Sequence, residues 1–113
     1  MKKLIDWAAK THQQAVQILP INDTTITHTW MDSYPYNSIS IYAFHPMYID
    51  LNQLGKMKDK EALAVFEARR QELNALPQID YEAVNNAKRA YLKVMFQQTG
   101  RKVLASAEFK KIL

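Results

Sequence analysis

Apolar residues recur every three or four positions at the start of the chain. Leu4, Ala8 and Ile18 fall on one face of a helix with 3.6 residues per turn. Pro20 follows this stretch, and it lacks the backbone N–H that would continue a helix. The spacing therefore predicts a helix over residues 3–18.

The apolar pattern then changes to an alternation of period two. Residues 24–31 are rich in β-branched side chains, and residues 38–44 place Ile39 and Ile41 opposite serine and tyrosine. The segment DSYPYN between them consists of residues typical of turns. This pattern predicts an antiparallel β-hairpin. Residues 47–51 alternate as well, so a three-stranded meander is the alternative.

Two longer helices are predicted in the second half of the chain. Asp59 and Asp80 each precede a stretch of helical periodicity, and an aspartate carboxylate there can accept a hydrogen bond from a free first-turn amide. The first helix should end at Pro77. The second should end at about Thr99, where Gly100 would be a typical C-terminal cap.

The order of these elements predicts an α+β fold in a single domain, residues 1–113. An N-terminal helix comes first, then the hairpin or meander, then two long helices and a short C-terminal helix. Ser106 is the expected cap of that last helix, which would carry Phe109, Ile112 and Leu113.

The same periodicities indicate a core. Ile39 and Ile41 should pack against the helices, so that Tyr42 and Phe44 point away from them. The helical residues expected in the core are Phe66, Leu73, Val84, Tyr91 and Met95.

The composition is that of a folded protein, because 48% of the residues are hydrophobic and 23% are charged. The chain has no cysteine, which excludes disulfides, thiolate metal ligands and a cysteine nucleophile. The N-terminal segment MKKLIDWAAKTHQQ lacks the apolar run of a signal peptide, and no stretch approaches the length of a membrane span. These features predict a cytoplasmic protein without membrane attachment.

Residues for catalysis or metal binding are sparse. The three histidines, His12, His28 and His45, show no spacing typical of metal ligands. Two glycines are too few for a nucleotide-binding loop, and no serine stands in a GxSxG motif. The chain is therefore predicted to be no enzyme and to hold no metal or cofactor. The alternative is a site that assembles only in three dimensions, from His28 and His45 with Asp32 or Asp50.

Aromatic residues concentrate in the middle of the chain. Residues 11–55 contain no lysine or arginine, although nucleic-acid platforms pair aromatic rings with basic residues. Aromatic side chains also anchor protein interfaces, while strand residues beneath a second layer are the ordinary alternative. The candidate protein-binding residues are Trp30, Tyr34, Tyr36, Tyr42, Phe44 and Tyr48.

These observations favour a small non-enzymatic protein-binding module, an inhibitor or adaptor of the kind found among phage and plasmid accessory proteins. That attribution rests on the class of small α+β proteins without motifs, since no family resemblance is found. Its protein partner is unidentified, and a homodimer through the same surface is an alternative. A second hypothesis is a nucleic-acid-binding accessory protein, although exposed helices carry charge in any case. It would use basic residues near the C-terminus: Lys88, Arg89, Lys93, Arg101 and Lys102.

Overall fold

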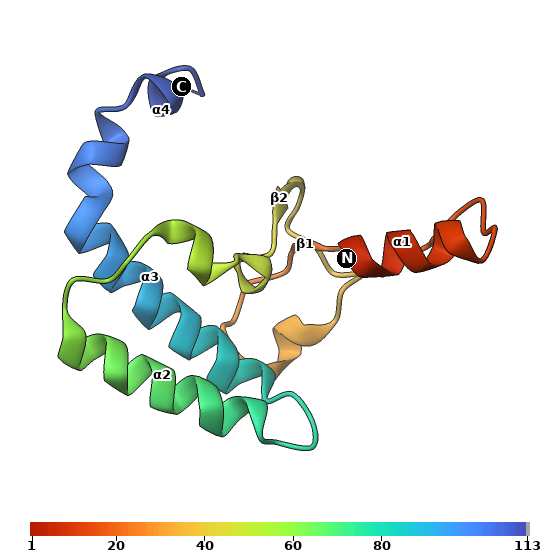
Figure 1. The fold of residues 1–113 in the computed structure, drawn as a ribbon, viewed down its shortest axis with the longest axis horizontal. Helices are drawn as coiled ribbons and strands as arrows, with labels where there is room; N and C mark the ends of the chain where they lie inside the picture. Colours follow the sequence, from red (N-terminus) through yellow and green to blue (C-terminus); the bar gives the residue numbers. More distant parts are fainter. Residues whose placement is uncertain (113) are drawn as a thin grey trace.

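The structure, a computed structural model, describes residues 1–112 (Figure 1). Within them it contains four α-helices, three 3-10 helices and one two-stranded antiparallel sheet, so the predicted α+β class is confirmed in its coarse form. In chain order the elements are α1 (Lys2–Lys10), β1 (Asn22–Asp23), η1 (Trp30–Ser33), β2 (Ser40–Phe44), η2 (Pro46–Tyr48), η3 (Leu51–Leu54), α2 (Lys60–Asn74), α3 (Tyr81–Leu104) and α4 (Ala107–Lys110).

The helices of the second half begin where their capping residues predict. The Asp59 carboxylate accepts a hydrogen bond from the amide of Ala62, and the Asp80 carboxylate accepts one from Ala83, both at 2.9 Å. The hydroxyl of Ser106 accepts the amide of Phe109 at 3.2 Å and so begins α4. Each cap satisfies an amide that the first helical turn leaves free.

Two predicted helix ends are wrong. Helix α3 continues through Gly100 to Leu104, because Gly100 keeps a helical conformation and lies buried against the ring of Phe96. Helix α1 ends at Lys10, not at residue 18. There the Thr11 hydroxyl donates to the carbonyls of Trp7 and Ala8, and His12 takes a positive φ of 60°. This turn stops the helix, and Figure 1 shows α1 projecting from the rest of the molecule.

The sheet differs from the predicted hairpin. Strand β2 lies within the predicted 38–44, but its partner is β1, with Asn22 opposite Phe44 and Asp23 opposite Ser40. Residues 24–31 form no strand, because the amides of Thr27 and His28 turn toward the carboxylate of Asp32 instead of a neighbouring strand. Residues 47–51 form no third strand either, since η2 and η3 cover most of this stretch.

The predicted core is confirmed only in part. Met95 is buried, whereas Phe66, Leu73, Val84 and Tyr91 are half-buried. The predicted sheet orientation is wrong, because Ile39 is 53% exposed and Ile41 is 73% exposed. Strand β2 stands on an arm beside the helices and does not lie flat against them (Figure 1).

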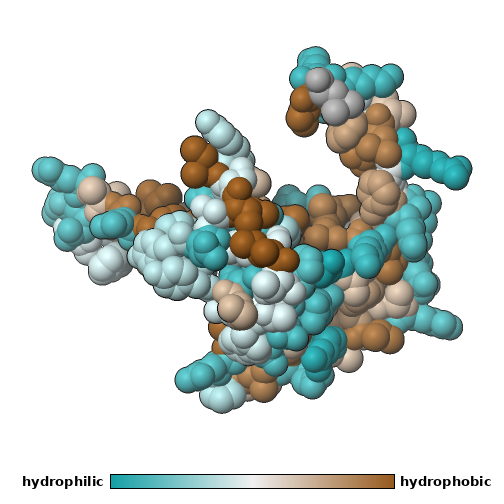
Figure 2. Space-filling view, turned by 180° about the vertical axis from the view of Figure 1, so that it is seen from behind, coloured by the Kyte–Doolittle hydropathy of each residue, from teal (hydrophilic) through white to brown (hydrophobic). Residues whose placement is uncertain are grey.

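Apolar side chains therefore stay on the surface. Among residues 1–112 the buried apolar residues are Ala8, Met57, Tyr81 and Met95. Figure 2 shows apolar residues gathered on the arm that carries β2 and over the helices. Leu113, which was expected on the last helix, lies outside the described residues. No helix between residues 1 and 112 is both long and apolar enough to cross a lipid bilayer.

Candidate functional site

A buried carboxylate organises the loop between β1 and β2. Asp32 is 6% exposed, and its side chain accepts hydrogen bonds from the Thr27 amide at 3.0 Å, the Thr27 hydroxyl at 2.8 Å and the His28 amide at 2.6 Å. His28 sits at a φ of 60°, which turns its amide toward this carboxylate. Hydrogen bonds to an ionised acceptor are about twice as strong as neutral ones. Asp32 therefore holds this loop in one conformation.

The hydrogen bonds also keep Asp32 ionised. Burial alone would raise the pKa of its carboxyl group, but the hydrogen bonds from Thr27 and His28 outweigh burial and hold the pKa below its ordinary value. The pKa of Asp23 is lowered in the same way, since the hydrogen bonds from the Thr25 hydroxyl and amide outweigh its desolvation. Neither carboxyl group is suited to donate a proton near neutral pH.

A second set of hydrogen bonds connects this loop to the helices. The phenol of Tyr81, the first residue of α3, donates to the backbone carbonyl of Asp32 at 2.9 Å. The Thr24 hydroxyl donates to the same carbonyl at 2.5 Å. The His45 Nε2 atom lies 2.6 Å from the Tyr81 oxygen, and the Met47 amide donates to His45 Nδ1 at 3.0 Å. We call His45, Tyr81 and the Asp32 carbonyl the relay.

The relay is buried and has a defined direction. Because the Met47 amide donates to Nδ1, we assign the proton of the neutral imidazole to Nε2, which then donates to Tyr81. Burial lowers the pKa of His45 below its ordinary value, and the negative charges of Asp23 and Asp32 only partly oppose this. His45 is therefore neutral at neutral pH.

The three-dimensional site considered for His28 and His45 forms only in part. The ring of His45 joins the relay, whereas His28 contributes its backbone amide to Asp32. Within residues 1–112 no group of three histidine, cysteine or acidic side chains lies close enough to hold a metal ion.

Aromatic side chains of the β1–β2 loop, of β2 and of η2 are exposed to solvent. We call the six predicted residues the aromatic surface, and every one is exposed, from 51% for Trp30 to 90% for Tyr42. The rings of Tyr34 and Tyr36 lie 5.5 Å apart and are tilted by 56°. The ring centroids of Trp30 and Tyr81 lie 6.2 Å apart, and those of Tyr48 and His45 lie 6.1 Å apart in an edge-on arrangement. Two members of the aromatic surface, Trp30 and Tyr48, therefore contact relay residues, and we call the exposed pair Tyr34 and Tyr36 the aromatic tip.

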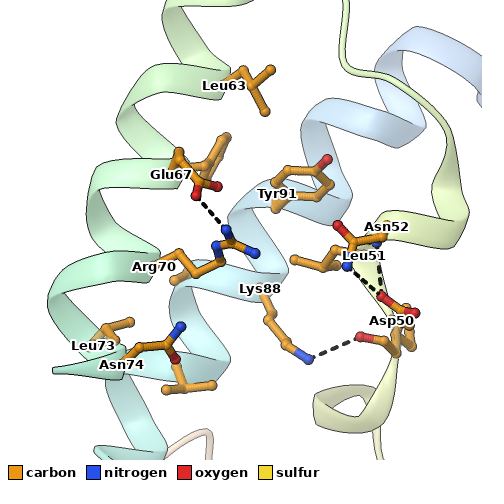
Figure 3. Close-up of a pocket in the computed structure, with 14 residues that line it drawn as sticks. Asp50, Leu51, Asn52, Leu63, Glu67, Arg70, Leu73, Asn74, Lys88 and Tyr91 are labelled. Carbon is orange, nitrogen blue, oxygen red and sulfur yellow. Dashed lines mark hydrogen bonds and ion pairs between the residues drawn. The ribbon is translucent and has the colours of Figure 1, made fainter. Parts of the chain in front are cut away.

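The predicted basic residues do not act alike. Lys88 is half-buried, and its ammonium group donates to the carbonyls of Met47 and Ile49. Burial lowers its pKa, opposed by the charge of Asp50. Lys88 thus fastens the η2–η3 segment to α3, as Figure 3 shows. The other basic residues of the set, Arg89, Lys93, Arg101 and Lys102, are exposed along α3.

A cavity lies between α2, α3 and η3, on the side of α3 from which Lys88 reaches the η2–η3 segment (Figure 3). Its volume is about 330 Å³, and its apolar wall includes the rings of Phe66 and Tyr91, which meet edge-on at 5.2 Å. Asp50, Arg70 and Lys88 also line it. This cavity explains why the predicted core residues Phe66 and Tyr91 are only half-buried.

The family profile described as 4-alpha-glucanotransferase, glycosyl hydrolase family 77, matches residues 1–112 of this chain. The chain belongs to the 4-alpha-glucanotransferase family. Over its full length it is 36% identical to the 4-alpha-glucanotransferase DPE2 of Oryza sativa subsp. japonica, of which it covers 12%. Over 89% of its length it is 35% identical to the 4-alpha-glucanotransferase of Chlamydia trachomatis, of which it covers 18%. The chain thus spans less than a fifth of these relatives. No solved structure matches it significantly.

Membership of the 4-alpha-glucanotransferase family corrects the functional prediction. The expectation of a non-enzymatic inhibitor or adaptor of phage or plasmid type is wrong, because the family is one of enzymes. The alternative of a nucleic-acid-binding accessory protein is set aside with it. No motif indicates this function, because glycosidic bonds are cleaved by a pair of carboxyl groups, which need no glycine, cysteine or histidine motif.

Sequence reasoning also missed the relay. The sequence places Asp32 in a turn or in a site with His28 and His45, and it indicates no role for Tyr81. The concentration of threonine and aspartate around residues 22–32 was the available signal, since such side chains often bond to neighbouring backbone groups.

Proposed function

We propose that this chain acts in the transfer of α-glucan segments by a 4-alpha-glucanotransferase, and that its part is to hold the glucan. The family match over residues 1–112 supports the activity. The exposed tyrosine pair at the tip of the aromatic surface supports the binding role. The face of a sugar ring carries C–H groups, which pack well on the electron-rich face of an aromatic ring.

The properties of the Asp23 and Asp32 carboxyl groups support a role in binding rather than in bond cleavage. A glycosidic bond is broken between two carboxyl groups, one of which needs a raised pKa to donate a proton. Asp23 and Asp32 have lowered pKa values, and their oxygens are occupied by loop amides and hydroxyls. These two residues therefore support the structure of the site.

The tilted tyrosine pair should fit a coiled glucan better than two coplanar rings would. α-Glucan chains coil, so that successive sugar rings are not coplanar, and the rings of Tyr34 and Tyr36 are tilted by 56° to each other. Both hydroxyl-bearing rings are more than half exposed. Trp30, Tyr42, Phe44 and Tyr48 extend the proposed contact around this tip.

The proposal is tested by titrating the chain with maltoheptaose and following binding by calorimetry. We expect the Tyr34→Ala, Tyr36→Ala double variant to bind at least about ten-fold more weakly, because a buried aromatic anchor typically contributes about 2 kcal/mol. The matched control is Trp7→Ala, which removes an exposed aromatic ring on α1, away from the aromatic surface.

Binding should be specific for the α-linked sugar, so cellohexaose is the comparison ligand. Wild-type chain that fails to bind maltoheptaose would contradict the proposal. So would a double variant that binds as tightly as Trp7→Ala.

A further inference from the structure

The relay joins three segments that lie far apart in the sequence. His45 follows β2, Tyr81 begins α3, and Asp32 lies in the β1–β2 loop that also contains Tyr34 and Tyr36. All three relay residues are at most 9% exposed, so water does not compete for their hydrogen bonds. The Asp32 carbonyl, which accepts the hydrogen bond from Tyr81, lies two residues before Tyr34, the first residue of the exposed pair.

We propose that His45 is a positioning residue for glucan binding, which fixes the loop of Tyr34 and Tyr36 through the phenol of Tyr81. The inference rests on the proposed function, because the loop it positions is the proposed glucan contact. His45 itself touches no part of the aromatic tip; it acts through Tyr81 on the Asp32 carbonyl. A loop held in its bound conformation loses less entropy when the glucan binds.

The hydrogen-bond directions make this positioning depend on the protonation of His45. In the neutral ring Nδ1 accepts the Met47 amide and Nε2 donates to Tyr81. A second proton would have to sit on Nδ1, opposite an amide that can only donate, so protonation breaks the fixed orientation of the ring. The titratable groups that face His45 are Asp23 and Asp32 by charge, Tyr48 from η2 and Tyr81 from α3.

Two replacements of His45 separate the roles of its two nitrogen atoms. His45→Gln can place a polar group near Nε2 and retain the bond to Tyr81, whereas His45→Asn can place an oxygen only near Nδ1 and retain the bond to Met47. Tyr81→Phe keeps the ring against Trp30 and removes the phenol. His12→Asn is the control for loss of a histidine. His12 lies just after α1 with a φ of 60°, and asparagine tolerates a positive φ of this kind.

Maltoheptaose affinity is measured for each variant between about pH 7.5 and 5, the range in which histidine titrates. At the upper pH we expect His45→Asn and Tyr81→Phe to bind about five-fold more weakly, the effect of one hydrogen bond, while His45→Gln and His12→Asn bind like wild type. Wild-type affinity should fall as the pH drops, and His45→Gln should lose this dependence.

Two results would overturn the inference. One is a His45→Asn chain that binds as tightly as His45→Gln at the upper pH, and the other is a His45→Gln chain that keeps the wild-type pH profile. Failure of the proposed function looks different, because the Tyr34→Ala, Tyr36→Ala chain would then bind like wild type. A circular dichroism melt of each variant confirms that it is folded at the pH of measurement.

Discussion

At the scale of single residues, Asp32 shows how one carboxylate replaces a predicted strand. Its oxygens collect the amides of Thr27 and His28, and those amides are then unable to pair with β2. Its backbone carbonyl receives Thr24 and Tyr81 at the same time. The side chain and the backbone carbonyl of Asp32 thus both hold the loop that carries the aromatic tip in place.

Asp32→Asn should lower the free energy of unfolding by about 2 kcal/mol, because hydrogen bonds to a charged acceptor are lost and the new amide group faces backbone donors. Urea unfolding followed by circular dichroism measures the change. Asp23→Asn is the control and should cost less, since Asp23 is only half-buried and its side chain accepts hydrogen bonds from one residue, Thr25.

The sign of the pH dependence follows from the lowered pKa of Asp32. The folded state binds this proton less readily than the unfolded state, so the contribution of Asp32 to stability is complete above the unfolded value of 3.8 and is lost as the pH falls through the folded pKa. The stability difference between wild type and Asp32→Asn should therefore shrink at acid pH. A difference that stays constant down to about pH 2 would contradict this assignment.

At the scale of elements, the two caps of α2 and α3 are chemically alike and differ in what they position. Asp59 and Asp80 each accept one amide at 2.9 Å. Helix α3 begins with Tyr81, which carries the relay, whereas α2 begins with Lys60, an exposed residue. The same local motif therefore has consequences for the loop only in α3.

Asp80→Ala and Asp59→Ala should each lower the free energy of unfolding by about 1 kcal/mol, the usual cost of losing a helix cap. Asp80→Ala alone should also change the emission of Trp30, whose ring lies 6.2 Å from that of Tyr81. Fluorescence in a Trp7→Phe background isolates this signal. An equal spectral change in the two cap variants would show that Tyr81 does not depend on the α3 cap.

At the scale of the whole molecule, the chain is extended for its size. Its radius of gyration is 16.8 Å, compared with about 13 Å for a compact chain of this length. Helix α1 projects outward with Leu4, Ile5 and Trp7 exposed, and β2 exposes Ile41 and Phe44. Such surfaces are typical of interfaces, and the chain spans only 12% to 18% of the relatives described above.

We propose that these apolar surfaces form contacts with other protein surfaces. The chain by itself should then bind the hydrophobic dye ANS and self-associate as its concentration rises, because exposed apolar patches of this kind favour association. Dye fluorescence and sedimentation velocity measure the two effects. The double variant Leu4→Ser, Trp7→Ser should reduce both, and a monomeric wild-type chain without dye binding would contradict the expectation.

The sequence by itself determined the elements that local chemistry specifies. The starts of α2, α3 and α4 were predictable because Asp59, Asp80 and Ser106 act on amides within their own first turn. The concentration of aromatic residues around the turn was visible in the sequence, but their exposure was not, because a second layer could have covered them. Strand β2 was predictable from its alternation, although the partner strand and the buried face were not.

Only the tertiary structure decided how the middle of the chain folds and what it positions. Residues 24–31 have the composition of a strand, yet the carboxylate of Asp32 competes for their amides. The relay depends on contacts between residues 36 and 49 positions apart, His45 with Tyr81 and Tyr81 with Asp32, which no local pattern encodes. Apolar periodicity indicates which side chains share a face, but the position of neighbouring elements decides whether that face is buried.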